Sequence, residues 1–178
     1  MKVTETKLSG CLIIEPEVFG DSRGFFLETF NVSRYKEIAG INLEFVQDNH
    51  SRSSQYVLRG LHFQKNKQQG KLVRVIRGEV FDVAVDIRQN SPTFSQWVGV
   101  FLSEKNKKQV WIPPGFAHGF LVMSEYADFE YKCTEYYDGN DEGSILWSDP
   151  ALDIKWPHKS PKLSHKDLCA NLLSDLFL

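Results

Sequence analysis

The chain has 178 residues, of which 42% are hydrophobic and 25% are charged, and its formal net charge is −2. These values are typical of a soluble globular protein, and the lack of a basic run argues against nucleic acid or an anionic membrane as partner. No apolar run approaches the roughly 20 residues that span a bilayer, and residues 1–10 lack the apolar core of a signal peptide. Three widely spaced cysteines without a CxxC pair favour reduced thiols and a cytoplasmic protein.

The first predicted element is a short helix in residues 31–40, with Asn31 or Ser33 as its N-cap and Gly40 as its end. Residues 71–87 predict two strands that turn at 77–79. The second of these strands places four apolar side chains on one face: Phe81, Val83, Val85 and Ile87.

Further strands are expected in residues 95–103, 109–113, 119–123 and 128–137, separated by turns rich in glycine and proline. A second helix is predicted in residues 163–178, because Leu168, Leu172 and Leu176 form one apolar stripe. Many short strands with frequent turns predict an all-β sandwich or barrel, and the absence of repeats or linkers predicts a single domain over residues 1–178.

The segment 58–64, LRGLHFQ, contains the first candidate for chemistry, His62. Its imidazole could be a buried structural group, a general base or a metal ligand. Arg59 beside it offers a fork of donors suited to phosphate. In an ideal strand the two side chains would face opposite sides, so a shared site requires the strand to depart from regular geometry around Gly60.

The segment 113–120, PPGFAHGF, places His118 after a tight turn and resembles the second motif of the cupin superfamily. The first motif of metal-binding cupins has the pattern H-x-H, but here the second position is Gln64. His62 and His118 alone are too few for a stable transition-metal site, so we expect no metal.

Three other side chains have both structural and chemical readings. Tyr131 could pack in the core or donate a proton. Lys71 could be a solvated lysine at a strand end or a positive charge in a site. Asp167 follows Ser164 with the spacing of a helix cap, but a carboxylate can also orient an imidazole.

Seven stretches appear together in one order: EPEVFGDSRGFFLETFN, FVQDNHSRSSQYVLRGLHFQ, QGKLVRVIRGEVFDVAVDIR, SPTFSQWVGVFLS, WIPPGFAHGF, YKCTEYYDGNDEGSILWSDP and LSHKD. Together they resemble the dTDP-4-dehydrorhamnose 3,5-epimerases over about residues 8–170. The resemblance implies a cupin-type jelly roll (a double-stranded β-helix) with a few short peripheral helices. It also implies a homodimer, no cofactor, and dTDP-4-dehydro-6-deoxy-D-glucose as substrate in dTDP-L-rhamnose biosynthesis.

The resemblance also assigns the site residues. It implies His62 as base, Asp167 as its partner carboxylate, Tyr131 as proton donor on the opposite face of the sugar, and Lys71 beside the sugar. The substrate-binding positions that it implies are Arg23, Glu28, Gln47, Asn49, Arg59, His118, Glu142 and Lys166, with Arg23 and Glu28 reaching into the site of the neighbouring subunit.

Other functions remain open from sequence. A related sugar-nucleotide cupin could act at one carbon only, as a 3- or 5-epimerase or a ketoisomerase. A metal-dependent cupin oxygenase is disfavoured by the missing second histidine. A binding module without activity would show no proton exchange.

Overall fold

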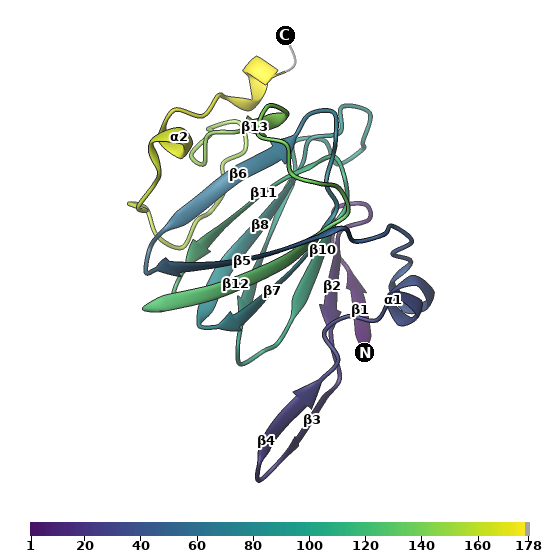
Figure 1. The fold of residues 1–178 in the computed structure, drawn as a ribbon. Helices are drawn as coiled ribbons and strands as arrows, with labels where there is room; N and C mark the ends of the chain where they lie inside the picture. Colours follow the sequence, from purple (N-terminus) through teal and green to yellow (C-terminus); the bar gives the residue numbers. More distant parts are fainter. Residues whose placement is uncertain (177–178) are drawn as a thin grey trace.

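The computed structural model describes residues 1–176, and its body consists of two antiparallel sheets that pack face to face (Figure 1). The six-stranded sheet has the order β1-β2-β10-β7-β12-β5 and the five-stranded sheet the order β13-β6-β11-β8-β9. The strands of the first sheet are β1 (Lys2–Glu5), β2 (Leu12–Glu15), β10 (Gln109–Ile112), β7 (Lys71–Arg77), β12 (Tyr126–Cys133) and β5 (Gln47–Ser54). Those of the second are β13 (Glu142–Ser144), β6 (Leu58–Gln64), β11 (Phe116–Val122), β8 (Glu79–Asp86) and β9 (Trp97–Ser103). The predicted all-β jelly roll is confirmed.

The described residues form three hydrophobic clusters, and alternation of side chains along β8 separates two of them. Val73, Val75 and Phe129 of the first sheet pack between the sheets against Ala84 and Phe120 of the second. The four apolar residues predicted to share one face of residues 80–87 pack together on the opposite face of β8, against the C-terminal segment. This burial is the main source of stability, because apolar area removed from water contributes about 25 cal/mol per Å².

The turn between β7 and β8 connects the two sheets. The sequence predicts two strands around residues 77–79, and both exist, but they lie in different sheets and do not pair. Gly78 has a φ of 80°, and a Cβ there would lie 2.0 Å from the backbone oxygen of Tyr126. Only glycine fits this turn, which carries the chain from one wall of the sandwich to the other.

Helix α1 (Val32–Ala39) begins and ends as predicted. The Asn31 side chain accepts a hydrogen bond from the backbone of Arg34, and Gly40 ends the helix in the left-handed conformation. None of the helices in residues 1–176 is long and apolar enough to cross a bilayer.

The second predicted helix is wrong as a continuous element. The structure has a four-residue helix α2 (His165–Leu168) and a separate 3₁₀ turn η1 (Leu173–Leu176). The chain breaks between them because the backbone N–H of Leu173 donates to the buried carboxylate of Asp149 at 2.6 Å. Leu168 is therefore exposed while Leu173 is buried, and residues 177–178 lie outside the described part of the chain.

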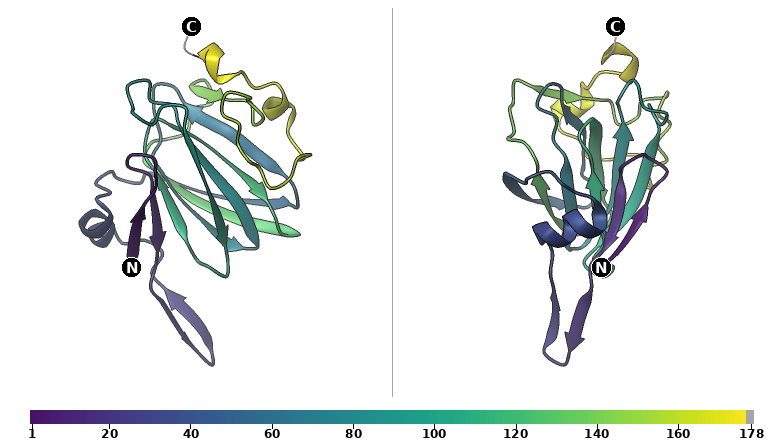
Figure 2. Two further views of the ribbon diagram at one scale, coloured as in Figure 1. Left: turned by 180° about the vertical axis from the view of Figure 1, so that it is seen from behind. Right: turned by 90° about the vertical axis from the view of Figure 1, so that its right-hand side faces the viewer.

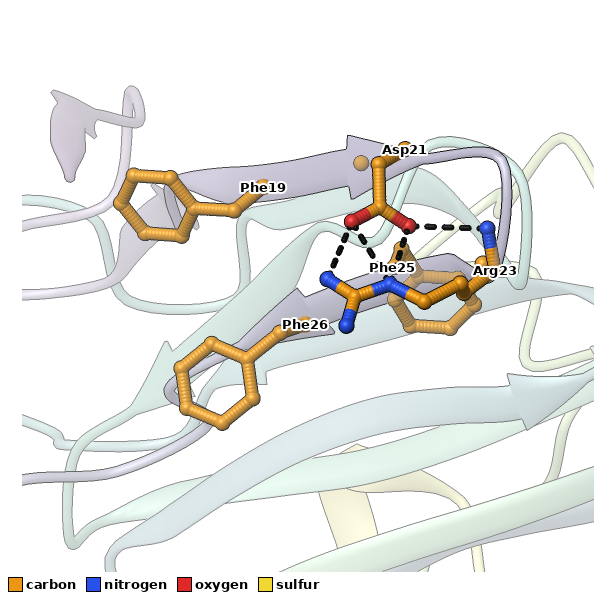
Figure 3. Close-up of a pocket in the computed structure, with 7 residues that line it drawn as sticks. Phe19, Asp21, Arg23, Phe25 and Phe26 are labelled. Carbon is orange, nitrogen blue, oxygen red and sulfur yellow. Dashed lines mark hydrogen bonds and ion pairs between the residues drawn. The ribbon is translucent and has the colours of Figure 1, made fainter.

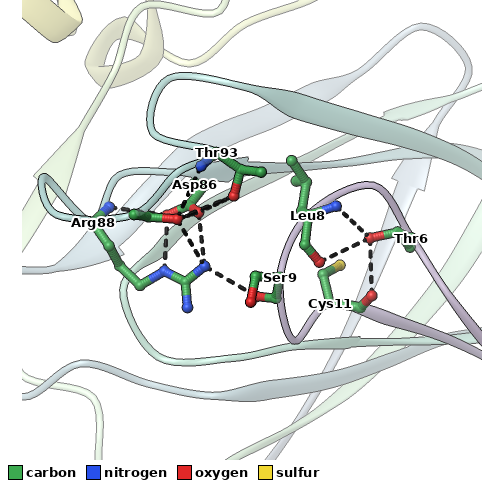
Figure 4. A network of polar contacts seen from close by, with 8 residues as sticks. Thr6, Leu8, Ser9, Cys11, Asp86, Arg88 and Thr93 are labelled. Carbon is green, nitrogen blue, oxygen red and sulfur yellow. Dashed lines mark hydrogen bonds and ion pairs between the residues drawn. The ribbon is translucent and has the colours of Figure 1, made fainter.

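Two further features extend from or tie down the body. Strands β3 (Val18–Asp21) and β4 (Gly24–Leu27) form a hairpin that projects away from both sheets (Figures 1 and 2). Elsewhere the buried carboxylate of Asp86 accepts hydrogen bonds from Arg88, Ser91 and Thr93 (Figure 4). Arg88 in turn donates to the backbone oxygen of Ser9, so this network joins the loop after β8 to the N-terminal loop.

Candidate active site

His62 on β6 and Asp167 on α2 form a hydrogen-bonded pair, with 2.6 Å between Nε2 of the imidazole and Oδ1 of the carboxylate. The other oxygen of Asp167 accepts a hydrogen bond from the Ser164 hydroxyl at 2.7 Å, while that hydroxyl also caps the helix by accepting from the Asp167 backbone. Burial raises the pKa of Asp167, but the hydrogen bonds from His62 and Ser164 outweigh it and hold the pKa below its usual value. Asp167 therefore lies in a capped first helical turn and also contacts the imidazole. The cap residue Ser164 holds the carboxylate in place.

Strand β6 departs from regular geometry at Gly60. Its pairing with β11 shifts register between His118 and Phe120, and Gly60 has a φ of 120°. Leu58 and Leu61, three residues apart, both pack in the core on the outer side of the sheet. The alternation is thus broken between them, so Arg59 and His62 lie on the same inner face. A Cβ at Gly60 would lie 2.5 Å from Cα of Gly119, which explains why glycine occupies this position.

Lys71 on β7 and Tyr131 on β12 lie on the facing sheet, with the Lys71 ammonium 5.9 Å from the centre of the Tyr131 ring. Burial raises the pKa of Tyr131 to about 12, against the nearby positive charge of Arg59. Burial lowers the pKa of Lys71, while Glu142 and Asp82 are among the groups that oppose this shift. The His62 imidazole and the Tyr131 phenol therefore lie on facing sheets, with the cations of Lys71 and Arg59 close to the phenol.

The rim of this region contains several predicted binding residues. Glu142 on β13 forms an ion pair with Lys166 at 2.5 Å and accepts a hydrogen bond from the Tyr137 hydroxyl. Burial raises the pKa of Glu142, but these bonds outweigh it and lower the pKa overall. The Gln47 amide accepts from the backbone N–H of Tyr137 and donates to Asn49, which links β5 to the same rim.

Arg23 and Glu28 are the two predicted residues that the structure does not bring to the others within one chain. Arg23 lies at the turn of the β3–β4 hairpin, where its guanidinium pairs with Asp21 (Figure 3). Glu28 follows the hairpin and pairs with Arg34 of α1 at 3.2 Å.

Gln64 occupies the position where a metal-binding cupin has its second histidine. Its amide donates to the backbone oxygens of Lys67 and Tyr136 and accepts from the backbone N–H of Asp138. The side chain thus ties together the two loops at the rim. Within residues 1–176, no three His, Cys, Asp or Glu side chains gather as a metal-ligand set.

Sequence reasoning missed two polar groups in this region. Asp82 on β8 is 1% exposed and hydrogen-bonds to Nε2 of His118 at 2.7 Å. In the sequence, Asp82 could have been noticed as an acidic residue between Val80 and Ala84 on one face of the strand. Tyr137 was hidden in the stretch predicted as strand 128–137, but β12 ends at Cys133 and Tyr137 belongs to the loop that follows.

Comparison with known proteins agrees with this geometry. The family model described as dTDP-4-dehydrorhamnose 3,5-epimerase matches residues 5–175. The dTDP-4-dehydrorhamnose 3,5-epimerase of Salmonella typhimurium is 58% identical over 180 residues, which cover 100% of this chain and 98% of the relative.

Solved structures agree as well. RmlC of Legionella pneumophila, in complex with dTDP-4-keto-L-rhamnose, has a TM-score of 0.95 and 57% identity, covering 97% of this chain and 93% of that chain. ChmJ, a 3'-monoepimerase of Streptomyces bikiniensis in complex with dTDP-quinovose, has a TM-score of 0.89 and 30% identity, covering 95% of this chain and 86% of that chain. On the match to the family model and to these relatives, the chain belongs to the dTDP-4-dehydrorhamnose 3,5-epimerase family.

Proposed function

We propose that this protein inverts C3 and C5 of dTDP-4-dehydro-6-deoxy-D-glucose, giving dTDP-4-dehydro-L-rhamnose in dTDP-L-rhamnose biosynthesis. Both carbons flank the C4 ketone, so each inversion removes a proton next to a carbonyl and returns a proton on the other face. The observation that carries the proposal is that His62 on one sheet, paired with Asp167 of α2, has Tyr131 and Lys71 on the facing sheet. A base and an acid on opposite walls are what such an inversion requires.

In this mechanism His62 removes the proton, and Asp167 fixes the imidazole tautomer and stabilises the imidazolium that forms. Lys71 supplies positive charge where the enolate oxygen develops; one such donor typically contributes about 2.7–4 kcal/mol to the transition state. Tyr131 donates the proton on the other face, because a phenol with a raised pKa retains its proton at neutral pH. The imidazolium and the phenolate then return to their starting states by exchange with solvent.

We assign the binding roles on charge and position. Arg59 is suited to bind the diphosphate, because guanidinium groups form paired hydrogen bonds with phosphate oxygens. His118, Glu142, Lys166, Gln47 and Asn49 surround the same region and provide donors and acceptors for the sugar and the nucleotide.

We also propose that the protein is a cytoplasmic homodimer in which the hairpin completes the partner's site. Phe19, Phe25 and Phe26 on the hairpin are all more than half exposed, and the hollow that they line with Arg23 has a volume of about 340 Å³ (Figure 3). A two-stranded hairpin is marginally stable alone, and three exposed phenylalanines gain most from burial against a second copy. Such packing would bring Arg23 and Glu28 to the site of the partner.

The test is proton exchange in D₂O with dTDP-4-dehydro-6-deoxy-D-glucose, followed by NMR. The proposed function predicts deuterium at both C3 and C5, and a His62→Asn variant that exchanges at neither. Deuterium at one carbon only would instead support the alternative of a single-carbon epimerase, as in ChmJ. No exchange in the wild type would refute the proposal.

A further inference from the structure

The sandwich contains a second imidazole–carboxylate pair, His118 and Asp82, which is more buried than the first. The two residues are 6% and 1% exposed, and Nε2 of His118 lies 2.7 Å from Oδ2 of Asp82. Asp82 shares its strand face with Val80 and Ala84 of the apolar core. A carboxylate in such surroundings is costly unless it is paired, so the two side chains form one fixed unit.

The orientation of His118 leaves its second nitrogen free. Among residues 1–176, Nδ1 of His118 makes no hydrogen bond, and neither do the Lys71 ammonium and the Tyr131 hydroxyl. No fully buried side-chain nitrogen or oxygen in this described part lacks a partner. These three groups are therefore accessible, and because polar groups in protein interiors are normally paired, they are the ones that a bound molecule would satisfy.

The sheet topology places the pair beside the proposed base. Strand β11 lies between β6 and β8, and His118 is the direct register partner of His62. Lys71 is on the facing sheet, and the charge of Asp82 contributes to its electrostatic environment. The His118 ring also stacks on Phe129, with 5.9 Å between ring centres, which limits its rotation.

We propose that Asp82 is a positioning residue that holds Nε2–H of His118 toward its carboxylate and Nδ1 toward the sugar, so that His118 and Lys71 together bind the oxygen that becomes negative during epimerisation. This inference rests on the proposed function and adds a donor to it. The Asp82 charge balances a second proton on the ring, so both nitrogens carry hydrogen and Nδ1–H donates to the enolate oxygen. No covalent bond to His118 forms or breaks, and the proton from carbon still goes to His62.

The principal variant is Asp82→Asn, which keeps the size of the side chain and an oxygen that can accept from Nε2, but removes the charge. Because the donor acts as charge develops, we expect kcat to fall 10–100-fold while KM changes less than threefold. Deuterium incorporation at C3 and C5 should fall together. The matched control is Asp86→Asn on the same strand, which removes a buried carboxylate away from the site and should leave kcat within twofold of wild type.

A double-mutant cycle separates positioning from a purely structural role. If Asp82 acts through His118, Asp82→Asn added to a His118→Gln variant should lower kcat less than twofold further. An undiminished effect in that background, a wild-type kcat in the single variant, or a loss confined to KM would each overturn the proposal.

The nitrogen-15 NMR spectrum of the histidine side chains provides a readout that does not depend on the variants folding. In wild-type protein with dTDP bound, His118 should have hydrogen on both ring nitrogens; a ring with hydrogen on only one nitrogen, whether Nε2 or Nδ1, would overturn the proposal. If the wild-type protein exchanges no deuterium into the sugar, the proposed function fails, and this spectrum still reports separately on the Asp82–His118 pair.

Discussion

The Asp167 carboxylate lies 2.6 Å from the imidazole of His62 although 105 positions separate the two residues in the chain. The carboxylate is held from behind by Ser164, which starts the helix that carries it. The His62 imidazole is thus oriented by a carboxylate that a helix cap in the C-terminal segment holds in place.

The first prediction concerns this pair. Asp167→Asn should lower kcat by about 10²–10⁴-fold, because an amide can hold the wrong imidazole tautomer and cannot stabilise the imidazolium. Steady-state kinetics with the dTDP-sugar would measure it. Ser164→Ala should reduce activity less than Asp167→Asn does, because the carboxylate remains. An Asp167→Asn enzyme with normal kcat would exclude the pair from catalysis.

The second prediction concerns Gly60. Gly60→Ala should destabilise the fold by on the order of 1–3 kcal/mol, because φ is 120° and the new Cβ would clash with Gly119. It should also reduce activity in the protein that does fold, because Arg59 and His62 share a face only through this irregularity. Urea unfolding and kinetics together test this. Gly139→Ala, where the nearest side-chain atom is 3.5 Å away, is the control expected to change neither.

The third prediction concerns the alkaline side of the pH–rate profile. Burial lowers the pKa of Lys71, so activity should decline as pH rises through that lowered value and the ammonium loses its proton. Tyr131, with a pKa of about 12, stays protonated throughout this range. Lys71→Arg should therefore move or remove the alkaline decline, while Tyr131→Phe should lower inversion but leave the decline in place. A decline unchanged in Lys71→Arg would assign it to another group.

The fourth prediction concerns acid stability. Burial raises the pKa of Asp86, but hydrogen bonds from Arg88, Ser91 and Thr93 outweigh it and hold the pKa at about 2. A carboxyl with a depressed folded-state pKa stabilises the protein above its usual pKa of 3.8, and this contribution is lost as pH falls toward 2. Asp86→Asn should cost about 2 kcal/mol at pH 7 and much less near pH 2, by urea unfolding. Asp153→Asn, at an exposed ion pair, should cost nothing measurable.

The fifth prediction tests the shared site. Arg23→Ala and His62→Asn should each be inactive alone. When the two variants are unfolded, mixed and refolded, half of the dimers are mixed, and each has one site with an intact His62 from one subunit and an intact Arg23 from the other. The mixture should regain about a quarter of wild-type activity. No recovery, with dimers present by light scattering, would place Arg23 in the site of its own subunit or outside catalysis.

Much of the fold was readable from the sequence because strand alternation, turn residues and the caps of α1 are local signals. Asn31 and Gly40 bound their helix as predicted. The C-terminal helix was mispredicted because the leucine spacing is also local, whereas the contact that breaks it, Leu173 with Asp149, joins distant segments.

The candidate site was likewise predictable where the signals are local and unpredictable where they depend on contacts between distant segments. Its residue types were visible in the motifs, and side-chain parity required an irregular strand at Gly60 once the resemblance had placed Arg59 and His62 in one site. The pairing of Asp82 with His118 was not visible, because it depends on which strand lies beside β11. Nor could any local pattern place β7 and β8 in different sheets.

The long sequence separation between His62 and Asp167 has a consequence during biosynthesis of the protein. All the strands that contribute to the two walls leave the ribosome before α2 does, because synthesis proceeds from the N-terminus. The segments that form both walls are thus synthesised before the carboxylate that pairs with the imidazole. The His62–Asp167 hydrogen bond can therefore form only after all of these strands have been synthesised.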